Sequence, residues 1–299
     1  MKENCMKIQF MHPGKQKPFK TGKGRRKKGY QQHDKGIIGE WNNDKSHYRK
    51  FLSNSGYYIN GLAYGQPKQA DLFFWGEWEA NTFFESLQDQ DLCIMPNGVH
   101  RPFHSTEIRG HQNTDPYVYG DCFKYCTCKQ TFKRNQIEIP RENIISMCPE
   151  SVILFGSNLS NKFYIDTVFV VKSFESSSEV IGNDTQNYSQ NYRETTLEQL
   201  GNYLKPSETK VTNKLFHGQT WWDNKEFFSF VPCKTDKGDK GFERFYLSHK
   251  AHPCLSTNPT GVSYLTKCEL THVVEAALNQ GFKLAVKLDE PKPYRIYEN

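Results

Sequence analysis

Residues 151–171 read SVILFGSNLSNKFYIDTVFVV and carry the clearest strand pattern of the chain. Two runs rich in β-branched and aromatic residues, 151–157 and 162–171, flank the polar turn at 158–161. Such a pair predicts a β-hairpin or two consecutive strands of a meander. The core of the protein is therefore expected to be a β-sheet, with further strands before and after this stretch.

Several other segments show strand or helix patterns. Alternating or strongly β-forming runs predict strands at 5–11, 70–80, 115–125 with an interruption at Gly120, 213–218, 226–232 and 282–288. Helices are expected at 47–58, 141–147 and 195–204, and from the capping box of Thr266 and Glu269 to Gly281. The pattern predicts a strand-rich α+β fold, either a mixed sheet or a partly closed β-barrel with a few peripheral helices.

Composition divides the chain into three parts. Residues 1–174 are expected to form a strand-rich domain with a glycine-rich basic arm at 14–36. Residues 175–194 are polar and low in complexity, which is typical of a surface loop or a linker. Residues 195–299 are expected to form an α+β region that packs on the first domain, or to continue it as one domain.

Positive charge is concentrated near the N-terminus. Residues 1–50 hold 14 Lys and Arg against four acids, a balance of +10, whereas the whole chain is +6 and residues 51–299 therefore sum to −4. Such a basic segment on an acidic body is typical of a protein that binds a polyanion, most commonly nucleic acid. The predicted phosphate-binding residues are Lys15, Lys17, Lys20, Lys23, Arg25, Arg26, Lys27 and Lys28.

Tryptophans supply a second feature of a nucleic-acid-binding protein. The segment WGEWE (75–79) holds two tryptophans and two acids, and Trp41 is a third candidate for stacking on a base. Strand alternation predicts Trp75, Glu77 and Glu79 on one face and Trp78 on the other. At most one of the two indoles is then expected to face a ligand while the other packs in the core. The alternative is that both pack in the core.

Four polar side chains are candidates for catalysis. The segment HQNTDPYVYGD (111–121) contains His111 and Asp115, residue types used in acid–base chemistry. Glu77 and Asp166 are two further carboxylates inside strand-like runs. The alternative for 111–121 is turn formation alone, because Asn and Asp side chains bind nearby backbone groups.

The nine cysteines are irregularly spaced. Without an apolar leader or a run of about 20 apolar residues, they are typical of reduced thiols in a cytoplasmic protein with no membrane partner. Cys122, Cys126 and Cys128 lack the two-residue gap of a zinc knuckle, so no metal and no cofactor are expected. A thiol nucleophile at Cys126 or Cys128 is an alternative for which the sequence assigns no histidine.

Three blocks together resemble a known family: FWGEWE (74–79), NTDPYVYGDCFKY (113–125) and the strand pair within 151–171. The strand pair is similar to that of PUA-like domains, although Glu150-Ser151 stands where the family has Gly-Asp. The order of elements resembles PUA-like bacterial proteins associated with nucleic-acid modification and mobile elements. The resemblance implies a β-barrel-like core with an aromatic pocket for a modified or flipped base.

These patterns favour a nucleic-acid- or nucleotide-binding protein, in which the basic arm holds phosphates and an aromatic pocket holds a base, linked to DNA or RNA modification or defence. One alternative is an enzyme that acts on nucleotides or nucleic acid through carboxylate and histidine chemistry. Another is a protein-interaction module whose arm meets an acidic partner. The oligomeric state is left open.

Overall fold

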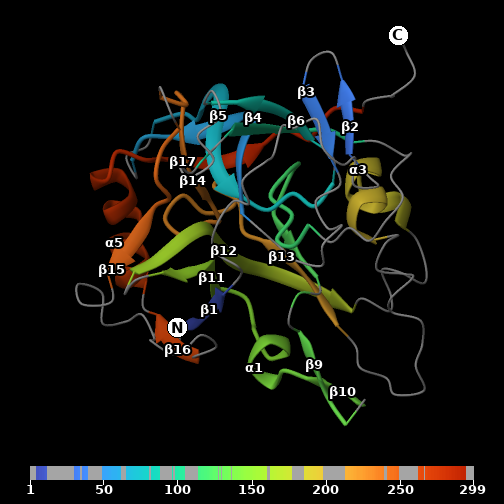
Figure 1. Cartoon of the computed structure of the whole chain (residues 1–299). Helices are drawn as coiled ribbons and strands as arrows, with labels where there is room; N and C mark the ends of the chain where they lie inside the picture. The colour runs from blue at the N-terminus through green and yellow to red at the C-terminus, as the bar shows by residue number, and fades with distance from the viewer. Residues whose placement is uncertain are drawn as a thin grey trace.

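The structure is a computed structural model of the whole chain (Figure 1). It describes residues 5–11, 30–33, 36–39, 49–61, 65–80, 82–87, 96, 98–104, 114–126, 128, 130–135, 137–159, 162–176, 185–197, 213–238, 241–248, 262–265 and 267–293. Within these ranges the fold is strand-rich, with few and mostly short helices, as the sequence predicts.

The predicted hairpin forms the centre of one sheet. Strand β11 (Val152–Leu159) pairs antiparallel with the long strand β12 (Lys162–Ser176), which confirms the expected strand pair. The sheet order is β16-β1-β11-β12-β13-β8, and β15 also pairs with β12. The other members are β1 (Cys5–Met11), β16 (Val262–Leu265), β13 (Lys214–Gly218), β8 (Lys124–Tyr125) and β15 (Tyr246–Ser248). The β1–β11 pair is parallel, and the rest are antiparallel.

A second sheet closes into a small barrel. Its order is β17-β14-β5-β4-β7-β6, and β17 also pairs with β4, so that four antiparallel strands form a closed ring. These strands are β4 (Lys50–Ile59), β5 (Lys68–Gly76), β14 (Val231–Lys234) and β17 (Lys283–Leu288). Strands β7 (Gly98–Pro102) and β6 (Thr82–Ser86) extend the sheet outside the ring. The barrel strands occupy the upper part of Figure 1, above β1, β11 and β12.

Apolar side chains join the two sheets. One buried cluster contains Leu52 and Phe74 of the barrel together with Phe155 and Phe169 of the hairpin. Helix α5 (Lys267–Asn279), at the left of Figure 1, buries its predicted apolar stripe in a second cluster that also spans both sheets. The stripe residues Leu270, Val273, Val274 and Ala277 are buried and Leu278 is partly buried, as expected for one face of an amphipathic helix. Gly281, at φ +76°, follows the helix end as predicted.

The smaller elements lie around these sheets. They are β2 (Tyr30–His33), β3 (Gly36–Gly39), β9 (Thr131–Arg134), β10 (Ile137–Pro140), the short helix α1 (Glu142–Ile145), and the helical turns η1 (Thr185–Asn187), α3 (Gln190–Tyr192) and η2 (Arg193–Leu197). Strand β2 lies within the arm expected at 14–36, and its partner β3 begins at the last residue of that arm. Both sheets combine strands from before and after the polar segment 175–194.

The expected helix at 47–58 is wrong, because this segment is strand β4. Strand β4 pairs with β5, the next strand in the chain, over nine residues and with the distant strand β17 on its other side, so its backbone groups are satisfied by other strands. Gly56, which resembles a helix stop, instead allows close strand approach. A Cβ atom there would lie 2.4 Å from the carbonyl oxygen of Lys287.

Three predicted strands are shorter in the structure. Of the run expected at 226–232, only the last two residues belong to a strand, since β14 begins at Val231. Strand β5 ends at Gly76, so the alternation expected for 75–79 does not continue to Glu79. In 115–125 only Lys124–Tyr125 is a strand, and Gly120 adopts φ +85°, consistent with the interruption expected there. None of the helices among the described residues has the length and apolarity needed to cross a membrane.

Candidate functional site

Both tryptophans of the WGEWE segment pack in the interior. Trp75 is 6% exposed, lies 5.7 Å from the Phe51 ring, and donates its indole N–H to the carbonyl of Phe242 at 2.9 Å. Trp78 is fully buried and meets the Tyr119 ring edge-on at 5.2 Å. These contacts match the core-packing alternative. They do not support the expectation that one of the two indoles faces a ligand.

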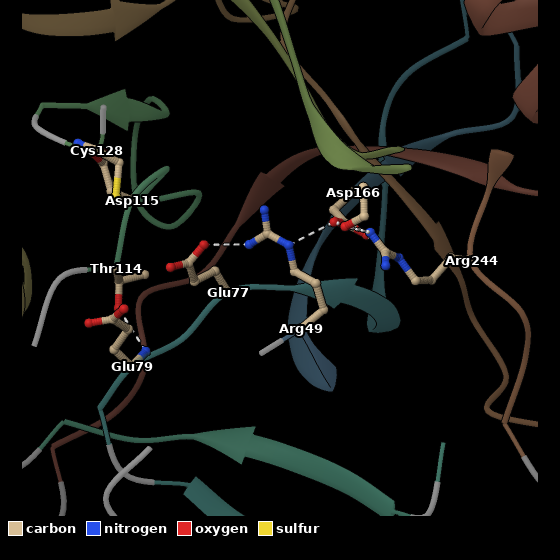
Figure 2. Close-up of polar contacts among 9 residues, drawn as sticks. Arg49, Glu77, Glu79, Thr114, Asp115, Cys128, Asp166 and Arg244 are labelled. Carbon is tan, nitrogen blue, oxygen red and sulfur yellow. Dashed lines mark hydrogen bonds and ion pairs between the residues drawn. The ribbon is translucent and has the colours of Figure 1, made fainter. Parts of the chain in front are cut away.

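Two predicted carboxylates, Glu77 and Asp166, lie in one buried ion network (Figure 2). Arg49, just before β4, pairs through Nη1 with Glu77 and through Nε with Asp166 Oδ2 at 2.8 Å. Arg244 binds Asp166 in a bidentate manner, at 2.7 and 2.6 Å, and donates to the Ser157 hydroxyl at 3.1 Å. The network therefore ties the start of the barrel to β11 and β12 of the other sheet.

Because the network is buried, each of its charged side chains depends on its partner for stabilisation. The side chains of Arg49, Glu77 and Asp166 are 1–2% exposed, and Arg244 is 5% exposed. Burial lowers the pKa of Arg244 below that of a free guanidinium, while the charge of Asp166 opposes this change. A buried charge whose partner is lost is costly to the folded state. Both oxygens of Asp166 already accept from arginines, so its described contacts are those of a structural ion pair.

Asp115 supports the backbone of its own loop. One carboxylate oxygen accepts from the backbone N–H of Cys126 at 2.9 Å and the other from that of Cys128 at 2.6 Å. The neighbouring Thr114 hydroxyl accepts from the backbone N–H of Glu79 at 3.0 Å, which connects this loop to the end of β5 (Figure 2). These bonds match the alternative in which 111–121 forms a turn.

The two thiols weighed as nucleophiles lie beside this carboxylate. Cys126 is 2% exposed. Burial raises the pKa of the Cys128 thiol well above its usual range, and the charge of Asp115 raises it further. A nucleophilic cysteine must reach the thiolate form, so the surroundings of Cys128 disfavour that role.

Lys50 is a buried amine that the sequence did not single out. It is 1% exposed and donates to the carbonyl of Ala80 at 3.4 Å. Burial lowers its pKa to about 7, although the carboxylates of Glu79 and Glu77 oppose the decrease. An amine with such a pKa can exchange a proton near neutral pH. In the sequence Lys50 is one of fourteen bases in a basic region, and no local pattern indicates its burial.

His100 lies close to Lys50. Its Nδ1 is 2.8 Å from the Thr82 hydroxyl. Burial lowers the pKa of His100 well below its ordinary value, and the positive charge of Lys50 lowers it further. The structure thus gathers Lys50, His100 and Glu77 into one electrostatically coupled group. His100 and Lys50 are the members that sequence reasoning missed.

The remaining predicted site residues lie outside the described residues. These are His111, Trp41 and the basic residues Lys15, Lys17, Lys20, Lys23, Arg25, Arg26, Lys27 and Lys28. Within the described ranges, no three His, Cys, Asp or Glu side chains are grouped so that they could hold a metal ion. Compared with known proteins, the chain has no significant match to any family model, curated protein or solved structure.

Proposed function

We propose that the protein binds nucleic acid or a nucleotide, with residues 15–28 as the phosphate-binding segment. The observation that carries the proposal is the charge separation, with a balance of +10 in residues 1–50 and −4 in residues 51–299. Clustered Lys and Arg bind a phosphate backbone by releasing its counterions, which needs no preformed pocket.

The fold provides an attachment for this segment at both ends. Strand β1 precedes it in one sheet, and β4 follows it in the barrel. This arrangement supports phosphate contacts that position a ligand without reading its sequence.

Base stacking requires an aromatic ring that is open to solvent. Among the described tryptophans, Trp75, Trp78 and Trp221 are buried, whereas Trp222 is 51% exposed. We therefore add Trp222 to Trp41 as a candidate for stacking on a base, since every base offers a π face to such a ring.

The test is fluorescence anisotropy of labelled single-stranded DNA and RNA across a range of salt concentrations. The triple variant R25S/R26S/K27S should bind more weakly, with a smaller dependence on salt. A matched control, K68S/K225S/K292S, removes the same charge from exposed positions of the folded body. If both triple variants lose the same affinity for the oligonucleotides, the assignment of phosphate binding to residues 15–28 would be overturned. Absence of binding by the unchanged protein would overturn the proposal.

A second candidate function is an enzyme that acts on nucleotides or nucleic acid. It is favoured by the neighbouring Lys50 and His100, whose pKa values are both lowered, because perturbed pKa values cluster at functional sites. Nucleotides and oligonucleotides incubated with the protein would be examined for a change in mass. If Lys50→Met still binds the substrate but forms no product, the result would support an enzymatic function. If the unchanged protein forms no product, an enzymatic activity on the tested nucleotides and oligonucleotides is excluded.

A further inference from the structure

A cysteine, a histidine and a glutamate are aligned on the sheet that contains β13. The Cys122 sulfur lies 3.9 Å from Nδ1 of His217. The opposite ring nitrogen, Nε2, lies 2.6 Å from the Glu175 carboxylate. The order is that of a nucleophile, its base and a group that orients the base. None of the three belongs to the network around Arg49.

Strand pairing creates this alignment from distant segments. His217 on β13 lies opposite Lys124 of β8 and opposite Ser173 of β12. Cys122 is two residues before Lys124, and Glu175 is two residues after Ser173. Residues two apart along a strand share a face, and diagonal neighbours across a pair are within side-chain reach, which places Glu175 beside His217. Cys122 lies in the bend before β8, and its sulfur meets the other ring nitrogen from there. The central histidine therefore has one partner on each side.

Tyr188 contacts both Glu175 and His217. Its hydroxyl donates to Glu175 at 3.2 Å, and its ring lies nearly parallel to the imidazole of His217, at 8° between planes and 6.4 Å between centroids. Glu175 accepts from the Nε2–H of His217, and this favours the tautomer whose Nδ1 has a lone pair toward the thiol. Tyr188 and Glu175 thus fix the orientation that a base needs.

The charge state of His217 is also suitable for a base. Burial lowers the pKa of His217, with Lys124 and Lys172 lowering it further and Glu175 raising it. The imidazole is accordingly neutral at neutral pH and free to accept a proton. The groups that face it are Cys122, Glu175 and Tyr188, together with these two lysines.

Reagents can reach the thiol. Cys122 is partly exposed and is not in a disulfide, and the His217 side chain is 16% exposed. Because Cys122 and Glu175 face opposite nitrogens of one imidazole, they do not converge on a single metal ion.

We propose that Cys122 is a nucleophilic thiol that accepts an acyl group from an activated ester, with His217 as its general base and Glu175 as a positioning residue. The thiol proton passes to Nδ1 as the sulfur bonds to the carbonyl carbon. The bond from that carbon to the leaving oxygen then breaks, and the leaving group takes the proton from His217. Water then adds to the thioester carbon while His217 takes a proton from it, and the carbon–sulfur bond breaks to release a carboxylic acid as His217 passes that proton to the sulfur.

The experiment uses p-nitrophenyl acetate with the full chain and locates the acetyl group by mass spectrometry after an acid quench. Cys148, an exposed thiol of the same molecule, is the internal control and needs no substitution. We expect acetylation of Cys122 to be at least about tenfold faster than that of Cys148, because general-base assistance contributes on the order of a hundredfold or more. Equal rates at the two thiols would overturn the proposal.

Variants then separate the roles. His217→Gln should slow acetylation of Cys122 about a hundredfold, whereas Cys148→Ser should leave its rate unchanged. Glu175→Gln removes the charge that raises the pKa of His217, so the loss of rate on acidification should move to lower pH. A rate that is unaffected by His217→Gln, or an unshifted pH profile in folded Glu175→Gln, would remove that residue from the mechanism. This inference does not depend on nucleic-acid binding.

Discussion

Arg49 and Asp166 form a salt bridge at 2.8 Å with both side chains almost fully buried. Arg49 lies just before the first barrel strand, and Asp166 lies on β12 of the other sheet. Their contact, extended by Arg244, is a buried polar connection between the two sheets, which also meet through apolar side chains and through the backbone bridge of Val168 and Phe230. In the sequence Asp166 is a candidate for catalysis because it is a carboxylate inside a strand. In the structure its contacts are those of a salt bridge.

Replacing Asp166 with Asn should destabilise the protein by roughly 3–5 kcal/mol, because two buried arginines lose their shared counter-charge. The measurement is the free energy of unfolding from urea denaturation. Asp223→Asn is the control, since Asp223 pairs with the exposed Lys172, and such a pair contributes about 0–1 kcal/mol. Similar losses in the two variants would show that the buried network has no special importance.

Lys50 should make stability rise with pH between about 7 and 8. Its pKa is lowered to about 7 in the folded state, whereas an unfolded lysine titrates near 10.4. In this window the unfolded chain therefore binds more protons than the folded one, and the free energy of unfolding increases by about 1 kcal/mol per pH unit. The upper limit keeps the measurement below the ordinary pKa values of thiols and phenols.

The difference between the wild-type protein and Lys50→Met isolates this contribution. The variant should lose the rise in melting temperature between pH 7 and 8, while Lys68→Met, at an exposed position, should retain it. A parallel pH dependence in wild type and Lys50→Met would mean that Lys50 does not change its protonation in this range.

Trp78 and Trp222 should respond differently to truncation. Trp78→Ala empties a fully buried position and should cost about 3–5 kcal/mol of stability. Trp222→Ala, at a half-exposed position, should have a small effect on stability and weaken single-stranded oligonucleotide binding by about 1–3 kcal/mol. Urea denaturation and anisotropy titration measure the two effects. Unchanged oligonucleotide affinity in Trp222→Ala would exclude this indole from base stacking.

The basic segment should determine the salt dependence of binding. Replacing Lys23, Arg25, Arg26, Lys27 and Lys28 with Ser should reduce the slope of log affinity against log salt by about 0.7–0.9 for each phosphate that the variant no longer neutralises. The melting temperature should change little. A slope identical to that of the wild-type protein would show that these five residues do not bind phosphate.

Gly56→Ala should weaken closure of the barrel, because the added Cβ would lie 2.4 Å from the Lys287 carbonyl oxygen on β17. Overpacking of this kind costs about 1–3 kcal/mol. Gly281→Ala is a useful contrast, since its Cβ would meet no atom within 4 Å and the cost there is due only to its φ of +76°. Urea denaturation distinguishes the two, and a neutral Gly56→Ala would contradict the close strand approach.

Local sequence patterns are sufficient to predict the elements that are stabilised by residues close in the sequence. The hairpin of β11 and β12 and the stripe of α5 follow from residue periodicity and short connections. The helix prediction for segment 47–58 is wrong because its aromatic residues fit either a helix face or a strand. Its pairing with β5 and β17 decides between them. Closure of the barrel requires strands that are more than two hundred residues apart in the chain, since β4 begins at 50 and β17 at 283.

The sequence by itself determined which chemical groups are present and where charge is concentrated. The tertiary structure decided which partners and which degree of burial the described side chains have. Glu77 and Asp166 became ion-pair partners because the sheets bring Arg49 and Arg244 against them, and Lys50 acquired its unusual pKa through burial. Cys122 and Glu175 lie 95 and 42 positions from His217. Only strand pairing brings such distant residues together, and no local sequence pattern encodes it.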